Sequence, residues 1–222
     1  MAQPVIAYTK EVLDALEQAF TPQRLSPYKI RAKNNLEKAL DFYVWNTQVG
    51  QALYPPLQTL EVAMRNSINR ELVAKFTDKW YENKTPVLFD EKQFEKITSA
   101  IKRYDKGGPV PLNHIVSDLS FGFWSNLIDH KMYDELWKQS LHKAFPNRPR
   151  GTKRSNAAIP FTRLNTLRNR IAHHEAIFNR DLQTDYDLII ELTAWICPLT
   201  SSWSKAATED YFKQVIDSKP IV

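Results

Sequence analysis

Apolar residues recur along this chain at intervals of three and four positions, the spacing that places them on one face of an α-helix. No segment shows the sustained alternation of apolar and polar residues that is typical of a half-buried strand. We therefore predict an all-α fold. The pattern predicts helices over residues 5–20, 27–53, 56–76, 90–106, 111–118, 120–129, 132–145, 159–179, 184–206 and 208–218.

Prolines and capping residues indicate where these helices begin and end. Thr21-Pro22 is expected to end the first helix, and Ser26-Pro27 supplies an N-cap followed by proline at the first helical position. Tyr54-Pro55-Pro56 is expected to break or kink the path, because a proline inside a helix removes a hydrogen bond. Pro198 is expected to bend the helix over 184–206.

Length and composition limit the number of domains. With 222 residues and 43% hydrophobic content the chain can bury one good-sized core. We expect a single domain over residues 1–222, with helices in 1–24 and 207–222 as peripheral additions. The first residues show no basic segment leading into an apolar stretch, and no apolar run is long enough to span a membrane. We therefore expect a cytoplasmic protein that does not associate with membranes.

One stretch, residues 163–178, combines an arginine, an amide and two histidines on a single predicted helix. On a helical wheel Arg168, Asn169 and His173 lie on the face turned away from the apolar sector. His174 falls at the border of that sector, so the two histidines are not equivalent. The apolar sector itself consists of Leu164, Leu167, Ile171 and Phe178.

An ordinary solvated helix face is the alternative interpretation of the same polar residues. Against it, the face carries Ala172 and Ala176 where long charged side chains are usual on a surface helix. Small residues leave room for another helix to approach closely. We therefore expect this face to meet a partner.

The spacing Arg168-Asn169-x-x-x-His173 resembles the R-x4-6-H motif of the HEPN superfamily of nucleases and RNA-binding proteins. Three segments in the same order, 60–70, 119–124 and the Arg168 helix, resemble Abi-like bacterial proteins of the abortive-infection, Abi-2 type. The resemblance implies a HEPN-like helical bundle with additional helices, a symmetric homodimer and metal-independent RNA cleavage. It also implies a toxin-type effector in antiviral defence, with an RNA or protein antitoxin as a potential partner.

The Arg168 face carries the groups that RNA cleavage requires. RNA supplies its own nucleophile, the 2′-hydroxyl, so catalysis needs a proton-transferring group near pH 7 and a cation on the developing phosphorane charge. We predict that His173 moves the proton, that Arg168 binds the non-bridging oxygens, and that Asn169 holds the phosphate or orients His173. One histidine cannot easily act as both base and acid in a turnover. Two copies of the helix meeting across a twofold axis would form one composite site.

A second Arg-Asn dipeptide, Arg65-Asn66, lies on another apolar helix, but Arg70 stands where a matching motif would have histidine. The family pattern includes this dipeptide. We therefore predict that Arg65 and Asn66, together with His174, support the geometry of the Arg168 helix. A structural ion pair of Arg65 is the alternative, since a buried arginine needs partners.

The net charge of +5 is concentrated in residues 146–158, which carry four cations and no acid. One glycine and two prolines predict a loop whose cations are mobile and solvated. We predict that this loop contacts the RNA backbone beside the active face, with an affinity that falls as salt rises. A solubilising connector is the alternative. The cations are Arg148, Arg150, Lys153 and Arg154.

No cofactor and no metal are expected. Divalent-metal sites require converging carboxylates or spaced histidines and cysteines, and near the motif the chain offers only Glu175 and, beyond it, Asp181. Three function hypotheses stay open. They are an endoribonuclease acting on cellular or invading RNA, a non-cleaving RNA-binding module associated with a structured non-coding RNA, and a protein-interacting helical bundle without salt-dependent RNA affinity.

Overall fold

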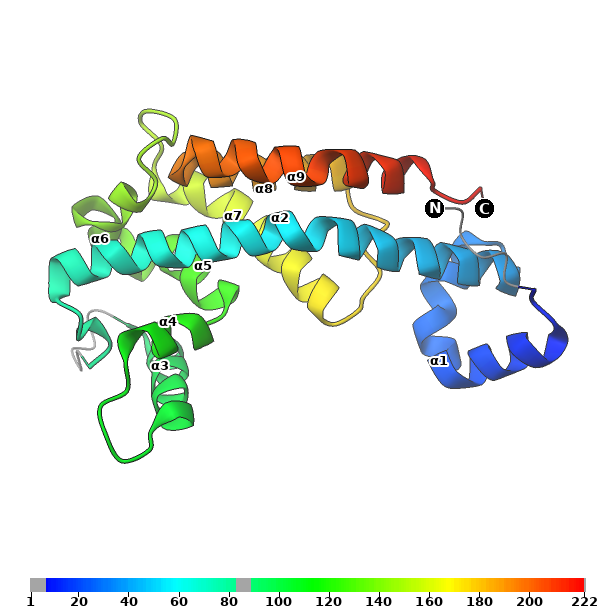
Figure 1. Cartoon of the computed structure of the whole chain (residues 1–222), viewed down its shortest axis with the longest axis horizontal. Coiled ribbons are helices and arrows are strands. Elements are labelled where there is room, and N and C mark those ends of the chain that lie inside the picture. Colours follow the sequence, from blue (N-terminus) through cyan, green and yellow to red (C-terminus); the bar gives the residue numbers. More distant parts are fainter. Residues whose placement is uncertain (1–6, 83–88, 222) are drawn as a thin grey trace.

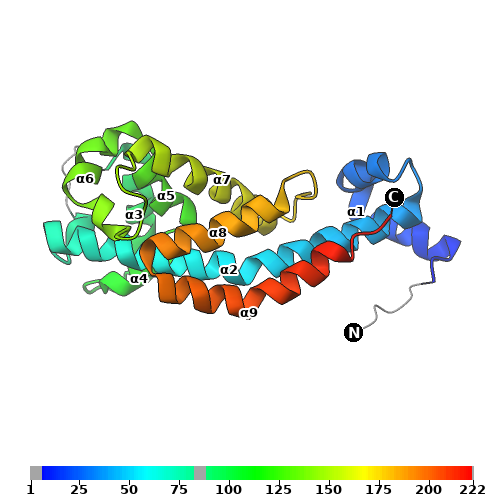
Figure 2. The ribbon, with the colours of Figure 1, turned by 90° about the horizontal axis from the view of Figure 1, so that it is seen from above.

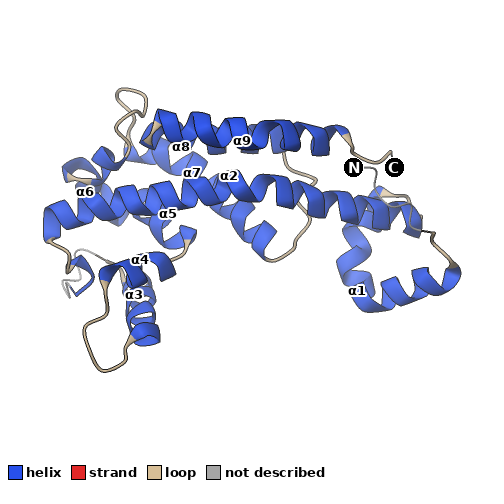
Figure 3. Ribbon diagram, viewed as in Figure 1, coloured by secondary structure: helices blue, strands red, loops and turns tan. Residues whose placement is uncertain are grey.

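The computed structural model describes residues 7–82 and 89–221, and within these ranges it contains helices but no strand (Figures 1 and 3). The prediction of an all-α fold is confirmed. The α-helices are α1 (Lys10–Arg31), α2 (Leu36–Phe76), α3 (Glu91–Tyr104), α4 (Leu112–Asp118), α5 (Phe121–Asp129), α6 (Asp134–Gln139), α7 (Arg154–Ala172), α8 (Leu182–Ile196) and α9 (Pro198–Asp217). Short 3-10 helices are η1 (Trp80–Glu82), η2 (Lys131–Tyr133) and η3 (Leu141–Ala144).

The long helix α2 is the central element of the molecule (Figures 1 and 2). Helices α8 and α9 pack against each other and along α2, and α5 packs against α7 on another side. Helix α1 lies at one end of the molecule, against the first half of α2 (Figure 2). The core-facing residues in the second half of α2 are Leu57, Leu60, Met64, Ile68 and Leu72.

Helix α2 passes through Pro55-Pro56 without interruption, so the predicted break there is wrong. A proline inside a helix costs about 3 kcal/mol locally. Apolar packing on both sides of the pair outweighs this cost, because Leu53 and Leu57 are both buried in the core. Tertiary contacts, which the local pattern does not contain, keep the helix continuous.

The predicted helix over 27–53 is interrupted instead at residues 32–35. Lys33 and Asn34 adopt φ angles of 51° and 64°, in the left-handed region that ends a helix. Asn35 then caps α2, its side chain accepting a hydrogen bond from the N–H of Lys38 at 2.9 Å. The predicted stop at Thr21-Pro22 is a kink inside α1, where Thr21 has φ 67°.

The C-terminal part also differs from expectation. The predicted helix over 184–206 is divided at Cys197 into α8 and α9, rather than bent at Pro198. Residues 207–217, expected as a peripheral helix, form the second half of α9 and contribute Phe212 to the core. None of the described helices has the length and apolar character needed to span a bilayer.

Candidate functional site at the end of α7

Arg168 projects from α7 toward α2, where its Nε lies 3.4 Å from Oε2 of Glu61. Both side chains are partly exposed, at 36% for Arg168 and 20% for Glu61. A guanidinium has five N–H donors, and this contact engages only the one on Nε. Glu61 therefore orients Arg168 and leaves its outer nitrogens available to a second anion.

Helix α7 ends in a Schellman turn, with His173 as the C-cap and His174 in the left-handed conformation at φ 57°. The N–H of Glu175 donates to the carbonyl of Arg170 at 2.8 Å, and that of His174 donates to the carbonyl of Ile171 at 3.0 Å. Both histidine side chains are exposed. His173 is thus presented on the turn that follows the helix.

The prediction of a helix over 159–179 is wrong at both ends, because α7 spans Arg154–Ala172. Glycine is the usual signal for a left-handed residue after a helix, and this chain has a histidine there. The apolar spacing also continues through the turn, since Ile177 is buried and the Phe178 ring lies 4.7 Å from that of Phe42. The helical-wheel positions of residues beyond 172 therefore do not apply.

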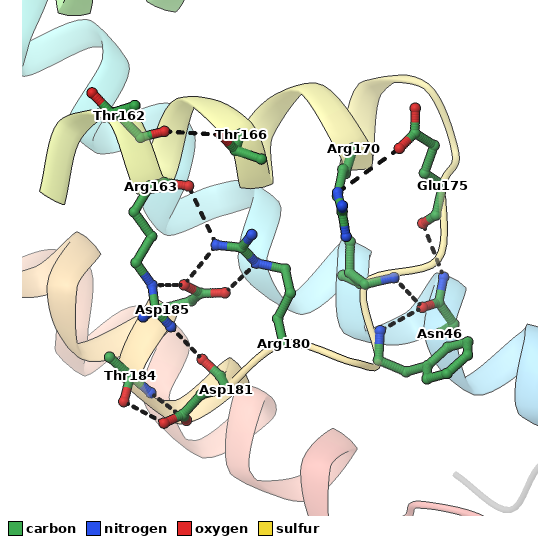
Figure 4. A network of polar contacts seen from close by, with 12 residues as sticks. Asn46, Thr162, Arg163, Thr166, Arg170, Glu175, Arg180, Asp181, Thr184 and Asp185 are labelled. Carbon is green, nitrogen blue, oxygen red and sulfur yellow. Dashed lines mark hydrogen bonds and ion pairs between the residues drawn. The ribbon is translucent and has the colours of Figure 1, made fainter. Parts of the chain in front are cut away.

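Asn46 of α2 holds the segment that follows the turn (Figure 4). Its buried side-chain oxygen accepts hydrogen bonds from the N–H of Ile177 at 2.8 Å and of Phe178 at 3.2 Å. Its amide nitrogen donates to the carbonyl of Glu175 at 3.4 Å. One amide from the centre of the protein thus anchors the histidine turn.

Arg24 of α1 contacts the turn from the other side. Its guanidinium donates to the carbonyl of His174 at 2.7 Å and lies 3.5 Å from the carbonyl of His173. Helix C-termini carry a partial negative charge, which a nearby cation offsets. Arg24 therefore makes this helix end more favourable for an anion than an isolated helix end would be.

A groove of about 350 Å³ runs between α2 and the end of α7. Gly50 lies in its wall, in the interior of a helix, where glycine is less stable than alanine. A Cβ at Gly50 would meet Ile171 at 3.8 Å, an ordinary contact, so packing does not require glycine there. The groove is also lined by Tyr54, which is 59% exposed, and by Ala172 and His174.

The family model for Abi-like protein matches residues 7–179, which contain α1 to α7 and the histidine turn. The chain belongs to the Abi-like protein family. Comparisons with curated proteins and with solved structures return no match. The resemblance noted in the sequence is therefore confirmed at the level of this family. Membership suggests an abortive-infection-type function.

The structure does not bring every predicted site residue of this Abi-like protein to one place. Arg168 and His173 lie at the same end of α7, and Asn169 lies between them with its carbonyl accepting from the N–H of His173 at 2.9 Å. Arg65 and Asn66 instead line a hollow against α4. The Arg168 side chain reaches α2 at Glu61, one turn before Arg65.

Two arginines of the predicted basic loop are held by internal contacts. Arg148 donates to the carbonyls of His142 at 2.7 Å and Phe145 at 3.0 Å, and its guanidinium lies over the Trp137 ring. Arg154 begins α7, pairs with Asp134, and donates to two carbonyls at the end of α5. The prediction of solvated, mobile cations is therefore wrong for these two.

Arg150 and Lys153 are exposed, as predicted, but they lie at the opposite end of α7 from His173. Eighteen helical steps separate the two ends by roughly 27 Å. Within one chain the loop is therefore not beside the candidate catalytic groups. Asn147 fixes its start, since its N–H donates to the carbonyl of Trp195 at 2.9 Å.

Between these two ends, Asp185 of α8 joins α7 to the segment beyond the turn (Figure 4). Its fully buried carboxylate accepts from Arg163 at 2.6 Å and from Arg180 at 2.6 and 3.0 Å. Charged groups buried in this way are stable only when paired. Arg163 thus belongs to the framework that carries the site.

The carboxylates near the motif have roles in local structure. Glu175 lies 3.9 Å from Arg170, and Asp181 caps α8 by accepting from the N–H of Thr184 at 3.1 Å. Hydrogen bonds from the hydroxyl and then the N–H of Thr184 lower the pKa of Asp181. In residues 7–82 and 89–221 no three His, Cys, Asp or Glu side chains are grouped so as to hold a metal ion.

Proposed function

We propose that this Abi-like protein is a metal-independent endoribonuclease of the HEPN type and acts as a toxin-like effector in abortive infection. The observation that carries the proposal is the presence of a partly exposed guanidinium, Arg168, and an exposed imidazole, His173, at the same end of α7. The two residues also match the R-x4-6-H spacing. Membership of the Abi-like family supports the defence role.

In the proposed reaction the 2′-hydroxyl of the RNA attacks the adjacent phosphorus. The bond between O2′ and phosphorus forms, the bond to O5′ breaks, and the products carry a 2′,3′-cyclic phosphate and a 5′-hydroxyl. His173 moves the proton, and Arg168 binds the non-bridging oxygens as their negative charge grows. Asn169, exposed between them, holds the phosphate or orients the imidazole.

The reaction needs one group to remove the 2′-hydroxyl proton and another to protonate the leaving oxygen. The proposal assigns proton transfer to one imidazole of each chain, that of His173, so we propose that a twofold dimer brings two copies of His173 into one cleft. Exposed Ala172, directly before the turn, allows close approach of the partner. If one cleft uses His173 of both chains, an excess of inactive His173→Ala chains should suppress the activity of the wild type, because each mixed dimer lacks one of the two imidazoles.

The groove beside Ala172 and His174 is proposed to hold an unpaired base next to the cleaved phosphate. Proteins recognise single-stranded RNA by stacking exposed aromatic rings on its bases, and Tyr54 offers such a ring. The absence of a side chain at Gly50 keeps this space open.

The test is a gel of end-labelled RNA incubated in chelator with the wild type, His173→Ala and His114→Ala. His114 is a matched control because it is exposed on α4, where its ring packs at a tilt against Tyr104. Loss of a general acid or base costs about 10²- to 10⁴-fold in rate. We expect that loss for His173→Ala, with RNA binding retained, and none for His114→Ala. Equal cleavage by all three proteins, or by none, would contradict the proposal.

A non-cleaving RNA-binding module, held with a structured non-coding RNA, is the second candidate. The observation that favours it is the separation along α7 of the two candidate RNA contacts. Arg150 and Lys153 are exposed at one end and His173 at the other, so an RNA that contacts both must extend well beyond a single phosphate linkage. This hypothesis predicts binding that weakens with salt, without cleavage by the wild type.

A further inference from the structure

A second hollow, of about 420 Å³, lies between α2 and α4, away from the groove at the histidine turn. Its polar lining consists of one guanidinium, three carboxamides and one hydroxyl, and it contains no carboxylate. An anion therefore meets only neutral or positive polar groups there. These groups belong to Arg65, Asn66 and Asn69 on α2 and to Asn113 and Ser117 on α4.

Arg65 is the unusual member of this group. Its Nε is buried and has no hydrogen-bond partner. No ion pair joins Arg65 to any carboxylate in the described part of the chain, so the structural ion pair considered from the sequence is not formed there. A buried donor without a partner is costly in folded proteins. The outer nitrogens of the Arg65 guanidinium are not buried and donate no hydrogen bond within the described residues, so they are open to a ligand in the hollow.

Asn69 supplies a donor with a defined direction. Its side-chain oxygen accepts a hydrogen bond from the indole N–H of Trp80 at 2.9 Å. Trp80 is completely buried, so this contact settles which end of the amide is the oxygen. The Asn69 nitrogen, with two N–H donors, is then left for another acceptor.

We propose that this hollow is a phosphate-binding site. A guanidinium with amide and hydroxyl donors matches the geometry and charge of phosphate oxygens. Arg65 lies one helical turn, about 6 Å, along α2 from Glu61, the residue that orients Arg168. The phosphate belongs either to the RNA chain that crosses the α7 site, which rests on the proposed function, or to a free nucleotide. The experiment separates these sources.

The first arm measures thermal unfolding of the whole protein with inorganic phosphate or AMP, against chloride at equal ionic strength. Variants are Arg65→Met and, as the control, Arg70→Met, because Arg70 is exposed on the same helix and donates to Ser67. Phosphate should raise the Tm of the wild type and of Arg70→Met, and leave that of Arg65→Met unchanged. Without phosphate, Arg65→Met should be at least as stable as wild type, because an unsatisfied buried donor has been removed.

The second arm measures RNA affinity at low salt for His173→Ala and for the double variant His173→Ala with Arg65→Met. A roughly tenfold loss in the double variant identifies an RNA phosphate as the ligand. Unchanged RNA affinity, with loss of the phosphate and AMP shifts, identifies a free nucleotide. The proposal is overturned if phosphate raises the Tm of Arg65→Met as much as that of the wild type. It is also overturned if the two proteins respond alike to phosphate, AMP and RNA. The first arm involves no cleavage, so failure of the nuclease proposal is a separate result.

Discussion

The two ends of α7 use their charged residues differently. At the N-terminal end Arg154 is only 10% exposed and is held by Asp134 and two carbonyls. At the C-terminal end Arg168 keeps a single carboxylate contact and remains partly exposed, and the His173 side chain is open to solvent. The comparison shows that an arginine's partners, rather than its place in a basic segment, decide whether it holds the fold or is left for a ligand.

The largest effect on the free energy of unfolding is expected at the Arg163–Asp185–Arg180 cluster, which lies between these two ends. Asp185→Asn keeps the size of the side chain but leaves Arg163 and Arg180 without their counter-charge. Removing one member of a buried ion pair typically costs several kcal/mol, so we expect the free energy of unfolding to fall by about 3 kcal/mol. Urea denaturation measures this loss. A loss below about 1 kcal/mol would show that this ion pair does not hold the fold together and that Arg163, like Arg168, is left available to a ligand.

A smaller effect, an increase in the free energy of unfolding, is expected at the histidine turn. His174 has φ 57°, where a residue with a Cβ is strained and glycine is not. His174→Gly should therefore raise the free energy of unfolding by about 1 kcal/mol. His173→Gly is the matched control, because φ is −94° there and glycine should destabilise the turn. Destabilisation by both changes would show that the His174 side chain outweighs the backbone strain.

The smallest effect concerns pH at the N-terminal end. A hydrogen bond from Arg154 is the main cause that lowers the pKa of Asp134 below its ordinary value of 3.8. A carboxyl whose pKa is depressed by folding stabilises the protein above its unfolded pKa and loses that contribution as pH falls through the folded pKa. Asp134→Asn should therefore be less stable than wild type near neutral pH, with a difference that shrinks below pH 3.8. A pH-independent difference in urea midpoints would contradict this.

Periodicity alone predicts the fold class and the buried face of α7, because Leu164 and Leu167 are fully buried. Helix ends are predicted poorly for a physical reason. Lys33 and Asn34 are the left-handed residues that follow α1, and His174 is the one that follows α7; none of them is glycine, the most recognisable signal. Conversely, Pro55-Pro56 suggests a break that tertiary packing prevents.

The motif places Arg168 and His173 near each other through helical spacing, which is local information. Their supports are not local. Arg24 contacts a carbonyl 150 positions away in the chain, and Asn46 contacts one 129 positions away. Glu61 lies in a segment noted for its family resemblance, but only the packing of α2 on α7 identifies it as the partner of Arg168. The internal partners of Arg148 and Arg154 depend on tertiary contacts in the same way.

The most direct test of the central claim is the chemistry of the cleaved ends. Mass spectrometry should compare an RNA strand with the same strand carrying one 2′-deoxy nucleotide immediately before the cut. We predict fragments with a 2′,3′-cyclic phosphate and a 5′-hydroxyl from the RNA, and no cut at that position in the substituted strand. Equal cleavage of both strands, or fragments with a 5′-phosphate, would contradict attack by the 2′-hydroxyl assisted by Arg168 and His173.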